Sequence, residues 1–325
     1  MRIVYFGTPE FAASQLEAIL AAGYEVAAVV TAPDKPAGRG KKIQCSEVKK
    51  KALEHSLCVL QPEKLKDPAF LETLASFQAD LFIVVAFRML PAAVWKMPPL
   101  GTFNLHASLL PQYRGAAPIN HAIINGETVT GLTTFFLNEE IDKGEIIMQE
   151  KMAISPDETA GELHDALMTL GNKVVVETIQ KIESQSFSTV TQETLSQGLI
   201  LKDAPKIFKD FCYVRWDRDC RSIYNHIRGL SPYPAAHTRL QSEAGETTEL
   251  KVFAAAMEPC THSLPCGSVM TDNKSFLKIA ARDGFIHLTR LQQAGKQAMD
   301  IEAFLRGFRL NGGWKAVSTH ENSEE

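Results

Sequence analysis

The first two-thirds of the chain alternate short apolar runs with longer segments whose apolar residues recur at helical spacing. The short runs are rich in Val, Ile and Phe, and they are too short for helices, so they predict buried strands. The predicted strands are Arg2–Gly7, Glu25–Thr31, Leu57–Gln61, Leu81–Ala86 and Gly101–His106. The predicted helices are Phe11–Ala22, Ser46–His55, Pro68–Phe77 and Pro118–Gly126. This alternation indicates βαβ units, so we expect an α/β chain with a Rossmann-like, mostly parallel sheet in its N-terminal domain.

Two further strands are predicted after these units, at Gly131–Asn138 and Ile146–Met152, with a turn at Glu140–Gly144 between them. A long helix follows at Thr159–Ile182, and the polar segment Glu183–Gln197 then interrupts the pattern in the manner of a linker.

The pattern changes from about Ala204 onward, where short alternating runs are separated by Gly and Pro. Regular short strands of this kind predict a small OB-like β-barrel. The predicted elements are a helix at Cys220–Gly229 and strands at His237–Leu240, Glu249–Ala255, Gly267–Met270, Leu277–Ala280 and Gly284–Gln292. We therefore expect domains at residues 1–184 and 207–318, a linker at 185–206 and a tail at 319–325.

Composition supports a folded protein of two domains, because 325 residues with 45% hydrophobic content can bury a large core. The net charge of −4 gives no whole-chain signal for nucleic acid, but it is uneven. Residues 1–199 carry 17 Lys and Arg against 23 Asp and Glu, whereas residues 200–325 carry 17 against 15. A local basic surface therefore remains compatible with the composition.

The six cysteines show neither zinc-ligand spacing nor a disulfide framework, which favours reduced thiols and no metal. The N-terminal apolar run is too short for a signal peptide. The longest apolar run, Leu81 to Phe87, is far shorter than the ~20 residues of a membrane span. We expect a cytoplasmic protein that does not enter a membrane.

Candidate chemistry lies at the end of the fifth predicted strand, at Asn104 and His106. Residues i and i+2 of a strand share a face, and α/β sheets bind ligands at the carboxyl ends of their strands. Asp142, in the predicted turn, also follows a strand. Each residue alone is more often structural, and Asp with Gly commonly forms a turn.

Together, these three side chains suit the attack of an amine on a formyl carbon. Asn104 would donate an N–H to the developing oxyanion, an interaction whose loss typically costs about 3–4 kcal/mol of barrier. His106 would relay protons near neutral pH. Asp142 would fix the His106 tautomer and stabilise its imidazolium, or position a water molecule that carries the proton.

The pattern N-x-H-x-S-L-L-P-x-Y-R-G, from Asn104 to Gly115, resembles the signature of the tetrahydrofolate-dependent formyltransferases. The resemblance implies 10-formyltetrahydrofolate as cosubstrate, no metal, and Asn104, His106 and Asp142 as the catalytic trio. It also implies that the folate site is lined by Ser108, Leu109, Leu110 and Pro111. Two positions depart from the family pattern: Arg88 stands where glycine is common, beside the expected folate pocket, and Lys143 replaces the usual threonine after Asp142.

The acceptor must be inferred from other segments. Asp34 to Lys51 carries seven Lys and Arg against two acids, and the two prolines and two glycines around Arg39 predict that its first half is a mobile loop rather than a strand or helix. A basic loop at this edge would bind phosphates, although a solvated lysine-rich surface is an equally good interpretation of the composition.

The start M-R-I-V-Y-F-G-T-P-E-F-A and the run P-D-K-P-A-G-R-G-K-K resemble the branch of the family that acts on methionyl-tRNA. That resemblance implies that Arg39, and more loosely Lys41 and Lys42, contact the end of a methionyl initiator tRNA. The C-terminal barrel would hold the body of the polynucleotide. We expect a monomer. The alternatives are a formyltransferase acting on a sugar-nucleotide amine and a folate or RNA binder without turnover.

Overall fold

The structure is a computed structural model that describes residues 1–37 and 42–317. The chain forms two compact units, and each is built from segments that are distant in sequence. Of the described residues, the first unit contains 1–37, 42–115, 129–153 and 164–203, and the second contains 116–128, 154–163 and 204–317.

The first unit is built on a twisted sheet whose strand order is β10-β9-β7-β6-β1-β2-β5. The five strands from β7 to β5 run parallel to one another, whereas β9 and β10 are antiparallel to their neighbours. This arrangement confirms the predicted Rossmann-like, mostly parallel sheet. The strands are β1 (Arg2–Gly7), β2 (Glu25–Val30), β5 (Val59–Leu60), β6 (Leu81–Val85), β7 (Thr102–His106), β9 (Val129–Phe136) and β10 (Ile146–Ala153).

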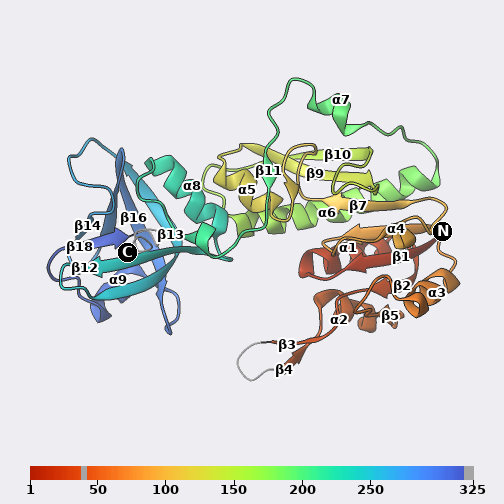
Figure 1. Ribbon diagram of the computed structural model, residues 1–325, viewed down its shortest axis with the longest axis horizontal. Helices are drawn as coiled ribbons and strands as arrows, with labels where there is room; N and C mark the ends of the chain where they lie inside the picture. Colours follow the sequence, from red (N-terminus) through yellow and green to blue (C-terminus); the bar gives the residue numbers. More distant parts are fainter. Residues whose placement is uncertain (38–41, 318–325) are drawn as a thin grey trace. The chain divides into compact units, whose positions relative to one another are not determined.

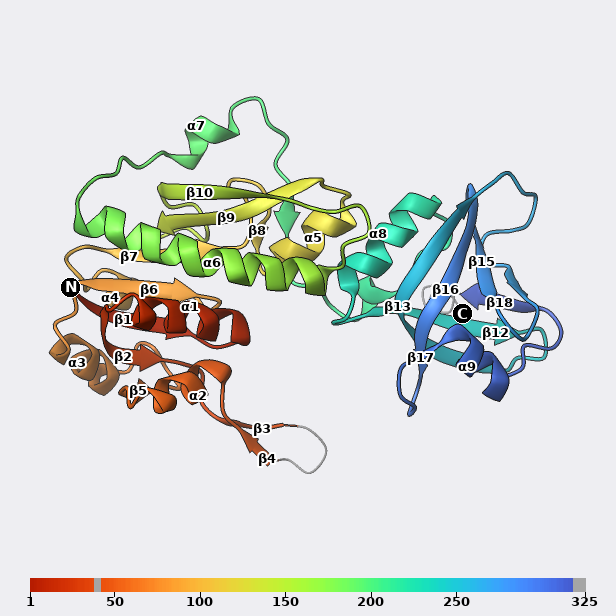
Figure 2. The same ribbon diagram turned by 180° about the vertical axis from the view of Figure 1, so that it is seen from behind.

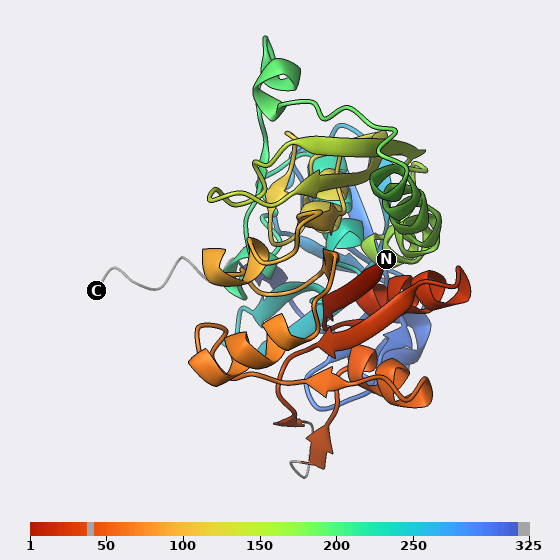
Figure 3. The same cartoon turned by 90° about the vertical axis from the view of Figure 1, so that its right-hand side faces the viewer.

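Helices cover both faces of this sheet, and the views in Figures 2 and 3 show α1 and α6 on one face and α3 and α4 on the other. Alternation along β1 supplies both faces: Val4 and Phe6 pack with Phe70 and Leu74 of α3, while Tyr5 is buried on the opposite side. The helices are α1 (Glu10–Ala21), α2 (Glu47–Glu54), α3 (Pro68–Ser76), α4 (Ala92–Trp95) and α6 (Ala160–Glu183).

The predicted loop around residues 34–44 is wrong in one respect, because a short antiparallel hairpin forms there. Strands β3 (Lys35–Ala37) and β4 (Lys42–Gln44) pair with each other, with Lys35 opposite Gln44. Pro and Gly signal a break in a regular element, but they do not exclude strands only three residues long on either side of it. The hairpin is drawn below β2 and α2 in Figure 1.

The second unit confirms the predicted OB-like barrel. Its antiparallel sheet has the order β14-β15-β16-β13-β12-β18, with β17 beside β16 (Figures 1 and 2). The backbone N–H of Ala316 in β18 donates to the carbonyl of Gly267, just before β14, at 2.8 Å, so the sheet nearly closes on itself. Ile223 and Ile227 of α8 are buried in its core.

The strands of the second unit are β12 (Ala236–Ser242), β13 (Thr247–Pro259), β14 (Val269–Thr271), β15 (Leu277–Ala281), β16 (Gly284–Gln293), β17 (Met299–Asp300) and β18 (Trp314–Val317). Its helices are α5 (Pro118–Ile124), the short 3-10 helix η1 (Asp210–Cys212), α8 (Cys220–Leu230) and α9 (Ile301–Gly307). Strand β11 (Asp203–Ala204) lies where the two units join in sequence. In the described part of the chain, no helix combines the length and the apolar content that crossing a bilayer requires.

Candidate active site

Asn104 and His106 lie at the carboxyl end of β7, which is hydrogen-bonded to β6 on one side and to β9 on the other. Their two-residue spacing places both side chains on one face of the sheet. Asn104 is half-buried, and its side-chain amide makes no hydrogen bond with any other residue that the structure describes. A ligand could therefore use this amide without displacing a protein partner.

His106 is 7% exposed, and its Nε2 lies 2.9 Å from the carbonyl oxygen of Tyr113. Because a carbonyl can only accept, Nε2 carries the proton of the neutral ring, and the lone pair is on Nδ1. The backbone of Tyr113 therefore selects the tautomer in which Nδ1 can accept a proton.

The loop from Ser108 to Pro111, predicted to line the folate site, is held by a buried threonine. The Thr133 hydroxyl donates to the Ser108 carbonyl at 2.7 Å and accepts the Leu110 N–H at 3.1 Å. Gln149 Nε2 donates to the Leu110 carbonyl at 2.7 Å and to the Thr133 hydroxyl at 2.9 Å. The backbone of this loop is thus fixed from β9 and β10.

Asp142 lies in the turn between β9 and β10 with a φ of 54°, in the left-handed region that Asp tolerates better than most residues. Its Oδ2 accepts the N–H of Gly115 at 3.0 Å. Gly144 allows this turn to form, since a Cβ there would lie 1.6 Å from the Phe136 carbonyl oxygen. Asp142 and His106 make no direct hydrogen bond to each other within the described residues, but both contact the stretch Tyr113–Gly115.

The two departures from the family pattern make contacts of their own. Lys143 pairs with Glu140 across the turn, while Asp142 keeps its bond to Gly115. Arg88 donates to the carbonyls of Pro62 and Glu63 and thereby ties the end of β6 to the segment after β5.

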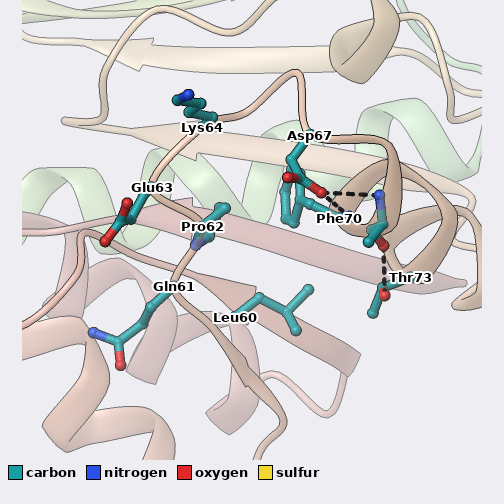
Figure 4. Close-up of a pocket in the computed structure, with 9 residues that line it drawn as sticks. Leu60, Gln61, Pro62, Glu63, Lys64, Asp67, Phe70 and Thr73 are labelled. Atoms are coloured by element: carbon teal, nitrogen blue, oxygen red, sulfur yellow. Dashed lines mark hydrogen bonds between the residues drawn. The ribbon is translucent and has the colours of Figure 1, made fainter.

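That segment borders an open hollow of about 570 Å³ between β5 and α3 (Figure 4). None of the predicted trio or of the predicted folate loop lines this hollow. The residues that do are Leu60, Gln61, Pro62, Glu63, Lys64, Asp67, Ala69, Phe70 and Thr73.

Of the residues predicted to bind tRNA, Arg39 and Lys41 lie outside the described residues, and Lys42 begins β4, where it pairs with Ala37. The base of the hairpin is held by Asp34, whose carboxylate accepts from Lys49 Nζ at 2.5 Å and from Gln61 Nε2 at 2.8 Å. These hydrogen bonds, from Lys49 first and then Gln61, lower the pKa of the Asp34 carboxyl. They fix the strand ends of the hairpin to α2 and to the end of β5.

Sequence reasoning missed three residues that support the site. Thr133 and Gln149 could have been suspected, because each is a polar residue in a predicted strand that is otherwise rich in apolar side chains. Gln192, in α7 (Gln192–Ser196), carried no such signal, because it lies in the polar segment taken as a linker. No cluster of three or more His, Cys, Asp or Glu that could bind a metal occurs within residues 1–37 and 42–317.

Comparisons with known proteins agree with the two-part fold. Residues 1–179 match the family model described as "Formyl transferase", and residues 206–309 match "Formyl transferase, C-terminal domain". The chain is 52% identical to a methionyl-tRNA formyltransferase of Bacteroides thetaiotaomicron over 97% of this chain and 98% of that protein. It is 53% identical to one of Parabacteroides distasonis over 95% of this chain and 96% of that protein.

Solved structures of low identity share the fold. The sugar 3N-formyl transferase WlaRD superposes with a TM-score of 0.65 at 19% identity, covering 91% of this chain and 99% of that one. An N-formyltransferase from Helicobacter canadensis gives 0.64 at 21% identity, covering 90% of this chain and 98% of that one. At this identity the likeness establishes the architecture alone.

Proposed function

The chain belongs to the methionyl-tRNA formyltransferase family, and on that premise we propose that it transfers the formyl group of 10-formyltetrahydrofolate to the α-amine of methionyl-tRNA. The observation that carries this proposal is the identity of 52% over 97% of the chain. The product, formylmethionyl-tRNA, would serve translation initiation. We further propose that the protein acts in the cytoplasm as a monomer.

In the proposed reaction, a bond forms between the amine nitrogen and the formyl carbon, and the bond from that carbon to N10 of the folate breaks. Asn104, whose amide bonds no other described residue, donates an N–H to the carbonyl oxygen as negative charge develops there. His106 accepts the amine proton at Nδ1, the basic atom of the tautomer that Tyr113 selects, and returns it to N10.

Asp142 acts on His106 through the backbone. Its carboxylate accepts the Gly115 N–H and so holds the stretch in which the Tyr113 carbonyl accepts from His106. Its negative charge also favours the imidazolium that forms during the proton transfer. Ser108, Leu109, Leu110 and Pro111 would form the wall of the folate site. The hydrogen bonds from Thr133 and Gln149 give that wall a fixed backbone.

We propose that the work is divided along the predicted domains. Residues 1–184 carry the transfer chemistry, and residues 207–318 bind the body of the tRNA, with 185–206 as the connection and 319–325 as a tail. Arg39, Lys41 and Lys42 would contact phosphates near the acceptor end. The anchored base of the hairpin suits a segment that must be presented at a defined position.

The acceptor is tested by supplying 10-formyltetrahydrofolate with one of three amines: methionyl-tRNA, a nucleotide-linked amino sugar, or glycinamide ribonucleotide. We expect transfer to methionyl-tRNA alone. Transfer to the amino sugar with none to methionyl-tRNA would replace this proposal with the sugar-nucleotide alternative. Folate binding without transfer to any amine would indicate a binding protein.

The basic hairpin is tested separately by Arg39→Ala. We expect a lower kcat/KM for methionyl-tRNA with unchanged folate affinity, because a lost phosphate contact weakens polynucleotide binding and leaves the folate site intact. Lys50→Ala is the matched control, since Lys50 is ion-paired with Glu47 on the exposed side of α2. Equal losses in the two variants would remove the specific role of Arg39.

A further inference from the structure

Gln192 is fully buried although it begins a short helix whose other residues are exposed or half-buried. A buried amide must satisfy both its oxygen and its nitrogen, because an unpaired polar group in the interior costs about 1–3 kcal/mol. The bonds of this side chain therefore show what it holds together.

The Gln192 amide binds Asp142 of the predicted trio and residues next to the trio. Its Oε1 accepts two hydrogen bonds from the Arg114 guanidinium, from Nε at 3.0 Å and from Nη2 at 2.7 Å. Its Nε2 donates to the carbonyl oxygen of Asp142 at 2.8 Å and to that of Gly144 at 2.9 Å. One side chain thus joins β8 (Arg114–Gly115) to the turn that carries Asp142.

These bonds close a ring. Gly115, the residue after Arg114, donates its N–H to the Asp142 carboxylate. Tyr113, the residue before Arg114, accepts the hydrogen bond of His106 Nε2 at its carbonyl oxygen. Three consecutive residues therefore bind His106, Gln192 and Asp142 in turn, Tyr113 and Gly115 through the backbone and Arg114 through its side chain. The structure gives Asp142 and His106 no direct bond, so beyond the pairing of β7 with β9 it is this stretch, and what holds it, that links the two side chains.

We propose that Gln192 is a positioning residue for formyl transfer, which holds the Asp142 turn and the Tyr113–Gly115 stretch in register so that Asp142 and His106 act together. The inference rests on the proposed function. A misplacement of about 1 Å among catalytic groups can lower a rate by roughly 10²-fold, so breaking this ring of hydrogen bonds should slow formyl transfer.

The segment around Gln192 has other attachments, so a substitution should disturb the ring without detaching the segment. Val190 and Ile146 exchange two backbone hydrogen bonds, at 2.9 and 3.0 Å, and Thr189 donates its hydroxyl to Glu145. The chain is thus fixed to the start of β10 two residues before Gln192.

The test compares Gln192→Glu with Gln197→Glu in the full-length protein. The first variant keeps the shape and the oxygen that faces Arg114, but it sets an oxygen against the carbonyls of Asp142 and Gly144. The second makes the same charge change at an exposed position of the same segment. Gln192→Met, similar in shape and uncharged, serves if the glutamate variant does not fold.

We expect the Gln192 variants to lower kcat for methionyl-tRNA formylation by about 10- to 100-fold, with KM for both substrates within about twofold of wild type. Gln197→Glu should match wild type. Arg114→Met should give a similar loss, and the double variant Arg114→Met with Gln192→Met should lose little more than the worse single variant, because both belong to one ring.

Three outcomes would overturn the inference: an unchanged kcat in Gln192→Glu, a loss confined to KM, or fully additive losses in the double variant. Wild-type protein that transfers no formyl group would refute the proposed function instead, so the two failures are distinguishable.

Discussion

Thr133 and Thr134 offer a matched pair of perturbations on adjacent residues of β9 whose side chains point to opposite faces of the sheet. Both are fully buried. The Thr133 hydroxyl holds the Ser108 carbonyl and the Leu110 N–H, whereas the Thr134 hydroxyl, among the residues that the structure describes, bonds only Thr178. Replacing either residue with Val preserves volume and β-branching and removes the hydroxyl alone.

The loss of unfolding free energy in Thr133→Val follows from the backbone groups that lose their hydrogen-bond partner. The Leu110 N–H and the Ser108 carbonyl lose their partner, while Gln149 keeps its bond to the Leu110 carbonyl. Two buried backbone groups left unpaired at about 1–3 kcal/mol each, with some relaxation, predict a loss of about 2–4 kcal/mol. Thr134→Val should cost about 1 kcal/mol, because Thr178 still donates to the Val174 carbonyl at 2.7 Å.

The assay combines hydrogen exchange at the Leu110 amide, urea unfolding, and a calorimetric titration with tetrahydrofolate. In Thr133→Val we expect faster exchange at Leu110, lower stability and weaker binding of tetrahydrofolate. In Thr134→Val exchange and binding should remain at wild-type values. Similar folate affinity in the two variants would refute the reasoning that Thr133 shapes the loop from Ser108 to Pro111.

Three further predictions concern other parts of the chain. Ser46→Ala removes the cap that accepts the Lys49 N–H at 3.0 Å, so urea unfolding should show a loss of about 0.5–2 kcal/mol; an unchanged midpoint would contradict it. Gly144→Ala places a methyl group 1.6 Å from the Phe136 carbonyl oxygen, so the turn that carries Asp142 must shift and kcat should fall more than about tenfold. A wild-type kcat in this variant would argue against a fixed turn. Burial lowers the pKa of His226, so the unfolded state binds a proton there more readily and the stability of the fold declines as the pH falls below 6.5. The fall in unfolding midpoint from pH 7.5 to pH 5.5 should therefore be smaller in His226→Phe than in wild type, and an equal fall would exclude that histidine as a cause.

The sheet of the first unit was predictable because its parallel strands are continuous apolar runs, as at Arg2–Gly7 and Leu81–Val85. The positions of Asn104 and His106 followed from the end of such a run. Sequence periodicity failed where an element is too short to show a period, as in the hairpin at residues 35–37 and 42–44. It also gave no reason to place the helix Pro118–Ile124 in the second unit, where Asn120 donates to the Gly229 carbonyl at 2.8 Å.

The supporting contacts of the site were harder to foresee, because they depend on tertiary structure. Gln192 looks like any polar residue of a linker until the fold buries it against Arg114 and the Asp142 turn. Asp142 was expected either to fix the His106 tautomer or to position a water molecule, and in the structure His106 and Asp142 each bond the backbone of Tyr113–Gly115. Backbone partners of this kind leave no residue-type signature in the sequence.

The central claim, that Asn104 and His106 at the end of β7 carry formyl transfer to methionyl-tRNA, is tested most directly by single-turnover transfer of labelled formyl from 10-formyltetrahydrofolate. The comparison is between wild type and Asn104→Ala. Wild type should form labelled formylmethionyl-tRNA, and the variant should react about 10²- to 10³-fold more slowly, because it lacks the oxyanion donor. The thermal midpoint should stay unchanged, since the Asn104 amide bonds no described residue. Equal rates in the two proteins would contradict the account.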